Sequence, residues 1–173
     1  MANVNTDLIT NFEATPQVKN AAHELHGVKR VAQGTIALAA GDLSASDTVM
    51  LAPVPTNASI TSIKLFNDDL DSGSTNTTDV GIYTTAGVAV DDDAYASAIT
   101  DLRGAVTTGT EVAFEARNIN AMGKQVWEDA GQSSDPGGYY YIGLTFDAAG
   151  DTCLLYTSPS PRDVEESRMP SSA

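Results

Sequence analysis

Oxygen-bearing side chains in one loop are the first candidates for chemistry in this chain of 173 residues. Asn67, Asp69 and Asp71 alternate and Gly73 follows, a pattern in which alternating oxygen atoms can face one calcium ion. The glycine stands one place late for an EF-hand, however, and no glutamate stands twelfth. The alternative is a solvated hairpin loop whose Asp and Asn side chains accept hydrogen bonds from neighbouring N–H groups. We therefore keep these three residues as calcium candidates and expect no other metal and no cofactor.

Two further clusters of metal-ligating residue types have simpler explanations. Asp91, Asp92 and Asp93 precede the alanine-rich AYASAIT. Carboxylates in this position favour the first turn of a helix, which we predict over residues 93–100. His23 and His26 flank a glutamate, but a zinc-protease helix has its histidines four positions apart and these are three apart. We interpret both histidines as surface residues of a polar segment.

Covalent catalysis and phosphate binding find little support in the sequence. Neither the G-x-S-x-G nucleophile motif nor a glycine-rich phosphate loop occurs, and the only cysteine is Cys153. Trp127 and Tyr140 could form an aromatic platform for a sugar. Successive tyrosines of a strand at 139–141 would face opposite sides, so that one or two of them belong to the core. We therefore expect a protein that is not an enzyme.

The charge of the chain limits its partners. Nine Lys and Arg residues against 23 Asp and Glu residues give a formal charge of −14. Nucleic-acid binding needs a basic face, and so does an anionic membrane surface. No segment approaches the roughly 18 apolar residues of a membrane-spanning helix. The opening MANVNTDLITNF also lacks the basic and apolar regions of a signal peptide. We expect neither nucleic acid nor a membrane as partner.

Short apolar and β-branched runs between Gly, Asp and Asn loops predict a β-rich domain. The predicted strands cover residues 28–40, 48–54, 59–67, 79–83, 88–90, 111–114 and 138–146. Helical structure is predicted as a turn near Thr15–Pro16, the helix at 93–100, and a helix at 118–130 that ends at Gly131. This pattern favours an all-β, mainly antiparallel β-sandwich of jelly-roll type. We place it at residues 28–152, after an N-terminal arm of residues 1–27.

The last segment, residues 153–173, differs from the rest of the chain. Its sequence CLLYTSPSPRDVEESRMPSSA resembles, in one reading frame, the translation of a sequencing adapter with a sample index between its two ends. We interpret it as non-native read-through in a metagenomic assembly. A disordered tail rich in Ser and Pro is the alternative. The sandwich would then lack its natural final strand, and we predict that the apolar residues Leu154–Tyr156 pair in its place.

Residues 58–146 resemble small uncharacterised structural proteins of tailed-bacteriophage virions. The likeness is carried by KLFNDDLDSG followed by DVGIY, then by DDDAYASAIT, RNINAMGKQVWEDAG and DPGGYYYIGLTFD. It implies a β-sandwich that forms part of a capsid or tail or sits on it. The function it implies is that of a non-enzymatic head decoration or minor capsid protein located in the virion. Its partners would be capsid or other virion proteins and further copies of itself.

The arm supplies the candidate contact residues for such an assembly. Leu8, Ile9 and Phe12 have no evident core to join, so we expect them to contact a neighbouring subunit. The alternative is that they pack back on the sandwich. The negative charge of the chain would keep many copies soluble before they assemble.

Two other classes of function stay open at this point. One is a carbohydrate-binding β-sandwich of a tail fibre or a secreted protein, which would use Trp127 and Tyr140. The other is an enzyme fragment whose active site lies beyond Thr152. Binding of a glycan would favour the first of these, and co-purification with virions would favour the structural protein.

Overall fold

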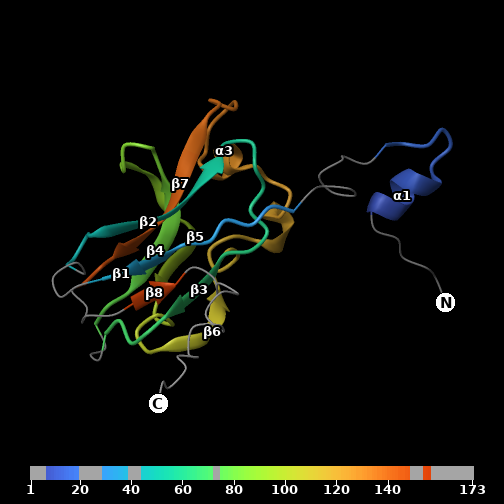
Figure 1. The fold of residues 1–173 in the computed structure, drawn as a ribbon. Helices are drawn as coiled ribbons and strands as arrows, with labels where there is room; N and C mark the ends of the chain where they lie inside the picture. The colour runs from blue at the N-terminus through green and yellow to red at the C-terminus, as the bar shows by residue number, and fades with distance from the viewer. Residues whose placement is uncertain (1–6, 20–28, 39–43, 72–74, 149–153, 157–173) are drawn as a thin grey trace, which may run out of the picture. The chain divides into compact units, whose positions relative to one another are not determined.

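The structure, a computed structural model, describes residues 7–19, 29–38, 44–71, 75–148 and 154–156 (Figure 1). The chain divides into two compact units, residues 1–31 and 32–173. Within the described ranges, no helix has both the length and the apolar character needed to cross a membrane.

Among residues 7–19 and 29–31, the described part of the N-terminal unit, one short helix forms, α1 (Asp7–Glu13). The predicted helical turn near Thr15–Pro16 is therefore wrong, because the helix lies earlier in the chain. Proline disfavours the helical conformation of the residue before it, which explains why the helix ends ahead of Pro16. After the helix the chain turns back, and the Val18 N–H donates to the Asn11 carbonyl at 3.1 Å.

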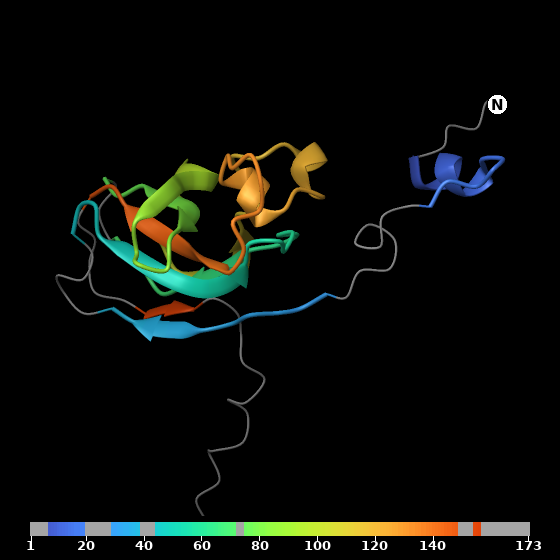
Figure 2. The same cartoon turned by 90° about the horizontal axis from the view of Figure 1, so that it is seen from above.

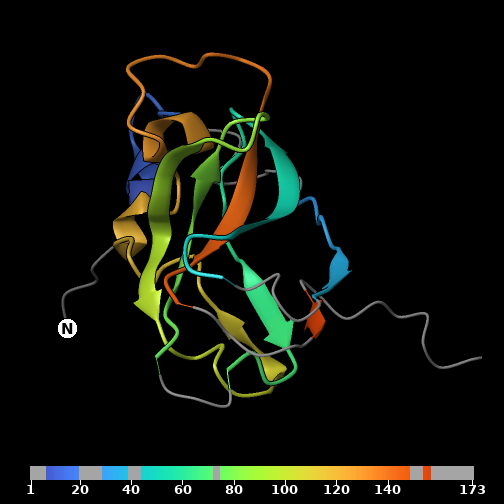
Figure 3. The same ribbon diagram turned by 90° about the vertical axis from the view of Figure 1, so that its left-hand side faces the viewer.

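The described residues of the larger unit form eight strands, which make two four-stranded antiparallel sheets. The first sheet has the order β1-β8-β3-β6 and consists of β1 (Thr35–Ala37), β8 (Leu154–Tyr156), β3 (Lys64–Asn67) and β6 (Val106–Glu111). The second sheet has the order β2-β7-β4-β5 and consists of β2 (Thr48–Pro55), β7 (Tyr139–Phe146), β4 (Thr78–Tyr83) and β5 (Ala89–Ile99). Figure 3 shows the four strands of the second sheet side by side.

The pairing of the strands is that of a jelly roll. β1 pairs with β8, β2 with β7, β3 with β6 and β4 with β5, and every pair is antiparallel. Four strands therefore run out and four run back, as in one long hairpin that has been rolled into two sheets. The prediction of an antiparallel β-sandwich of jelly-roll type is confirmed by this pairing.

β8 takes the place of the last strand of the roll. Thr35 pairs with Tyr156, and Tyr156 pairs on its other side with Phe66, so β8 lies between β1 and β3. Figure 2 shows β1 and β8 side by side below β2. The prediction that Leu154–Tyr156 pair as the final strand is confirmed. Within the described chain, β1 is joined to its sheet through β8 alone.

The core lies between the two sheets and follows the alternation of the strands. Ile142, Leu144 and Phe146 point inward from β7, and Val80 and Ile82 do so from β4. Fully burying a side chain of this size contributes about 1.5–3 kcal/mol. The remaining members of the core come from both sheets and from the segments that connect the strands. They include Leu65, Leu70, Tyr95, Leu102, Val112 and Val126.

A glycine pair on β4 and β7 allows a close approach of other groups. Gly81 and Gly143 lie opposite each other in the ladder. A Cβ atom on Gly81 would lie 2.2 Å from the carbonyl oxygen of Asp91, and one on Gly143 would lie 2.8 Å from the ring of Tyr83. The β5 backbone therefore folds closely over β4 at a point where no side chain fits.

The predicted helix at 93–100 is wrong, because these residues belong to the strand β5. Tyr95, Ala96 and Ile99 are buried, and Ala96 and Ile99 pair with β4. Burial and cross-strand pairing outweigh the weak helix preference of an alanine-rich run. The pairing with β4 shifts register three times, so that extra residues bulge out around Asp92.

The predicted helix at 118–130 forms as two short pieces. These are the 3-10 turn η1 (Ile119–Ala121) and the helix α3 (Val126–Asp129), with Gly123 between them. Gln125 and Glu128 form a capping box at the start of α3. Gly131 ends the segment with φ +69°, as predicted, and its N–H donates to the Glu128 carbonyl.

Several predicted strands differ from the observed ones in extent. The strand predicted at 59–67 forms only at β3, and the one predicted at 88–90 is part of the longer β5. Within the described part of the run 28–40, residues 29–38, the strand consists of the three residues of β1, which pair with β8. The strand predicted at 111–114 lies earlier, as β6 at Val106–Glu111, where it pairs with β3. Its threonine-rich sequence carries too little apolar alternation to be recognised as a strand.

Candidate functional site

The strongest cluster of polar side chains lies where the β3–β4 connection meets the turn between β5 and β6. Asn67, the last residue of β3, is only 2% exposed. Its Nδ2 donates to the carbonyl oxygens of Leu102 at 2.8 Å and Gly104 at 3.0 Å. Asn67 therefore holds the turn on both sides of Arg103.

Asp71 and Asn76 hold the same turn from the other side. The N–H group of Asp71 donates to the Arg103 carbonyl at 3.0 Å, and the N–H of Asn76 donates to Oδ2 of Asp71 at 2.9 Å. Arg103 in turn donates from Nε to the carbonyl oxygen of Asn76. Asp71 is 7% exposed and Asn76 is 3% exposed. We call Asn67, Asp71, Asn76 and the turn 102–104 the buried junction.

Two oxygen atoms of the buried junction have no hydrogen-bond donor. They are Oδ1 of Asn67 and Oδ1 of Asn76, both of which are shielded from solvent. A buried polar atom without a partner costs about 1–3 kcal/mol. Nearly all buried polar atoms in proteins have a partner, so these two oxygens identify the junction as a candidate binding site.

The structure places the three calcium candidates in different environments. Asn67 and Asp71 belong to the buried junction, whereas Asp69 is exposed and accepts a hydrogen bond at Oδ1 from the N–H of Asp71 at 3.2 Å. Asn76 was missed by the sequence pattern, since it stands outside the alternation of Asn67, Asp69 and Asp71. The available signal was its place in the same Asn- and Thr-rich loop, just before β4.

The three aspartates of β5 form a second acidic cluster. One carboxylate oxygen from each of Asp91, Asp92 and Asp93 lies within 4.8 Å of the others. Asp92 and Asp93 are exposed. Partial burial raises the pKa of Asp91, and the hydrogen bond with Asp93 and the charge of that residue raise the pKa further. Acidic side chains and a bulge on an edge strand are devices that prevent pairing with another chain.

A buried cation links α3 to the sandwich. Nη1 of Arg117 lies 2.6 Å from Oδ2 of Asp129, with the two side chains 6% and 4% exposed. The guanidinium lies between the rings of Tyr95 and Phe114, with its central carbon 4.5 and 4.6 Å from their centroids. Its other nitrogens donate to the main-chain oxygens of Ala113 and Ile60. This arrangement satisfies the cation fully and gives Arg117 a structural role.

The aromatic candidates lie on two different elements. Trp127, on α3, is half-buried and donates from Nε1 to Oε1 of Gln125 at 2.7 Å. Tyr140, on β7, packs against the core. Its neighbour Tyr139 is the exposed tyrosine of the strand, at 58%. The alternation along β7 thus offers Tyr139, rather than Tyr140, to solvent.

The candidate contact residues of the arm lie on α1. Ile9 is 44% exposed, whereas the side chains of Leu8 and Phe12 lie outside the described residues. His23, Glu24 and His26 also lie outside them. Other large apolar side chains that are exposed include Val18, Val31, Val88, Ile119 and Met122.

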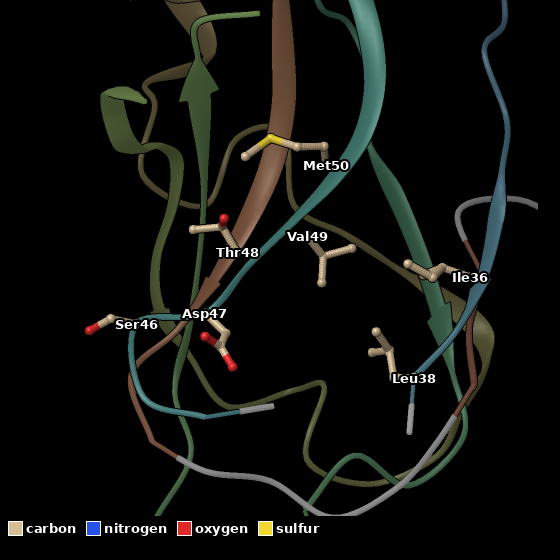
Figure 4. A pocket seen from close by; sticks show the side chains of 7 residues that line it. All are labelled: Ile36, Leu38, Ser46, Asp47, Thr48, Val49 and Met50. Atoms are coloured by element: carbon tan, nitrogen blue, oxygen red, sulfur yellow. The ribbon is translucent and has the colours of Figure 1, made fainter. Parts of the chain in front are cut away.

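A pocket of about 660 Å³ lies between β1 and β2, at one open side of the roll. Figure 4 shows Ile36 and Leu38 on one side of it and Val49 facing them from β2. Ser46, Asp47, Thr48 and Met50 complete the lining. The pocket is lined by apolar side chains within and polar ones at the β2 end, and none of the residues that line it is a histidine or a cysteine.

Two solved structures are similar to the chain. The first is a chain of the capsid of Ralstonia phage GP4, with 20% identity, a TM-score of 0.49, and coverage of 75% of this chain and 83% of that chain. The second is a chain of the cyanophage Pam1 capsid asymmetric unit, with 15% identity, a TM-score of 0.44, and coverage of 82% and 98%. No family model and no curated protein matches the sequence. The assignment of the fold rests on the strand pairing given above.

Proposed function

We propose that the chain is a non-enzymatic structural protein of a bacteriophage virion, a head decoration or minor capsid protein that acts by packing against other subunits. The observation that carries this proposal is an eight-stranded jelly roll joined to a separate N-terminal unit. Jelly rolls are used for viral capsid and lectin domains. The resemblance of residues 58–146 to virion proteins favours the first of these uses.

The distribution of charge supports docking of the arm on a second copy. Residues 32–152 carry 17 acidic and four basic residues, whereas residues 1–31 carry three of each. Two sandwiches therefore repel each other, but the N-terminal unit of residues 1–31, which contains the arm, has no net charge and can approach an acidic sandwich without like-charge repulsion. The exposed side chain of Ile9 is available for that contact, which would also include Leu8 and Phe12.

Oligomer size tests the arm contact directly. We expect the purified chain to form a homo-oligomer, measured by sedimentation velocity, and the I9D variant to shift it toward the monomer. The matched control is V88D, which places the same charge at another exposed apolar residue, in the sandwich. Equal effects of both variants, or a wild-type monomer at all concentrations, would contradict a role of the arm in assembly.

Long-read sequencing of the source DNA tests the class of protein. We expect portal, protease and major capsid genes beside this gene. We also propose that residues 153–173 are not part of the natural protein, and a read without sequencing adapters would replace them with another final strand. Neighbouring genes for secreted glycan-degrading enzymes would contradict the virion proposal. A read that encodes Cys153 onward unchanged would contradict only the proposal on the tail.

Carbohydrate binding is the second candidate function, because the jelly roll is also a lectin fold. Tyr139 is exposed and Trp127 is half-exposed. Affinity electrophoresis through polysaccharide gels tests this candidate with the wild type, W127A and Y140A. Retardation that is lost in W127A would favour a glycan-binding protein over a capsid protein.

A further inference from the structure

We propose that the buried junction binds a calcium ion. The junction joins the β3–β4 connection to the turn 102–104, and the oxygens that would bind the ion come from Asn67, Asp71 and Asn76, with Asp69 at its outer side. This site is independent of the assembly function proposed above, since none of these residues belongs to the arm.

The first observation behind this proposal is the pair of unpartnered amide oxygens. Oδ1 of Asn67 and Oδ1 of Asn76 are buried and accept no hydrogen bond. The Nδ2 group of Asn67 is fully used by main-chain carbonyls, which fixes the orientation of this amide. Both asparagines are anchored on the same turn, one to Leu102 and Gly104 and the other to Arg103. The two buried oxygens without donors therefore belong to residues that contact the same turn.

The second observation is the chemistry of the groups around them. Calcium takes six to eight oxygen ligands, from carboxylates, amide side chains, main-chain carbonyls and water. The junction offers the carboxylate of Asp71 beside Asn76, and its outer side carries Asp69. Among the sequence neighbours of the junction, Asp68 and Asp101 add negative charge, so that four acidic residues stand against Arg103. That balance favours a bound cation over a bound anion.

Arg103 does not neutralise the candidate ligands of the junction by itself. Its Nε is committed to the main-chain carbonyl of Asn76, and its own carbonyl accepts the N–H groups of Leu70 and Asp71. Its role is to fix the two loops against each other. An ion bound by the carboxylate and amide oxygens of the junction would also hold these two loops together. We therefore expect calcium to stabilise the fold.

Calorimetric titration of the full chain with CaCl₂, after treatment with EDTA, tests the proposal. We expect one site with a Kd of roughly 10⁻⁴–10⁻³ M, the range of sites with few charged ligands in extracellular modules. The D71N variant keeps an oxygen to accept the Asn76 N–H but loses the charge, and we expect its affinity to fall about tenfold or more. The N76D variant adds a charge at an unpartnered oxygen and should bind calcium more tightly than the wild type.

The acidic cluster on β5 provides the matched control. The triple variant D91N/D92N/D93N removes two exposed charges and one partly buried charge far from the junction in sequence, and we expect it to keep the calcium site. Binding that is lost in the triple variant and kept in D71N would assign calcium to β5 and overturn the proposal. No binding at millimolar calcium by the wild type and by a folded N76D would also overturn it, and would leave water as the partner of both amide oxygens.

Discussion

Arg117 and Asp129 form a buried ion pair at 2.6 Å that connects the segment after β6 to the helix α3. Both side chains are more than nine-tenths buried, and the guanidinium is further held between the rings of Tyr95 and Phe114. Burial raises the pKa of Asp129, although the charge of Arg117 and its hydrogen bond lower it. The desolvation of the carboxylate therefore outweighs its attraction to the arginine.

The first prediction concerns the loss of one partner of this pair. R117A leaves the Asp129 carboxylate buried without its cation and should reduce the free energy of unfolding by about 3–5 kcal/mol. The double variant R117M/D129L replaces both charges with apolar groups and should recover at least half of this loss. Urea unfolding followed by the fluorescence of Trp127, the only tryptophan, measures both. A loss below about 1 kcal/mol in R117A would contradict a structural role of the pair.

The second prediction concerns pH. Burial is the largest cause that raises the pKa values of Asp79, Asp91 and Asp129 above their ordinary value of 3.8. A carboxyl group with a raised pKa binds its proton more tightly in the folded chain than in the unfolded chain. Its contribution to stability is therefore greatest at low pH and is lost as pH rises from 3.8 through the raised value. We expect a higher Tm at mildly acidic than at neutral pH.

Thermal unfolding between pH 4 and 8 measures this dependence, and two variants separate its causes. D91N removes a partly buried charge beside Asp93 and should make the Tm less dependent on pH. D101N removes the same charge at an exposed position and should leave the dependence as it is. If both variants flatten the profile equally, total negative charge rather than the buried carboxylates sets the pH dependence.

The third prediction follows from the close approach of β5 to β4. A methyl group at Gly81 would lie 2.2 Å from the Asp91 oxygen and from the Asp92 main-chain carbon, and main chain cannot give way as a side chain can. We expect G81A to lose about 3 kcal/mol of stability. G123A is the control, since nothing lies within 4 Å of its added carbon. A neutral G81A in urea unfolding would show that β5 does not pack on β4 in this way.

The fourth prediction concerns β8. Removing residues 153–173 takes away the strand through which β1 joins its sheet. We expect the amides of Thr35–Ala37 to exchange with deuterium much faster in the shortened chain, while β7 in the second sheet keeps its protection. Mass spectrometry of peptic peptides compares the two regions. Unchanged protection of β1 would mean that another segment pairs with it.

The sequence predicted the strands that are rich in aromatic and β-branched residues, such as β7 and β4. It failed for β5, since an alanine-rich run forms a strand only because β4 lies beside it. It also missed Arg117, whose partners Asp129 and the Ile60 carbonyl lie 12 and 57 positions away. Such contacts depend on the completed fold and leave no local pattern.

The candidate site was predicted in part for a similar reason. The alternation of Asn67 and Asp71 is a local pattern and was visible in the sequence. The contribution of Asn76 depends on the turn 102–104, to which both asparagines are hydrogen-bonded. A contact between loops that are about 30 residues apart along the chain cannot be deduced from the spacing within one of them.

The pairing of the first strand with the last also bears on how the molecule is made. Thr35 pairs with Tyr156, which lies 121 positions later in the chain, and this is the largest sequence separation among the paired strands described here. During synthesis, therefore, the early segment emerges from the ribosome long before its partner exists. The roll closes only after residue 156 has been synthesised, so the step that completes it is slow compared with the formation of local hairpins.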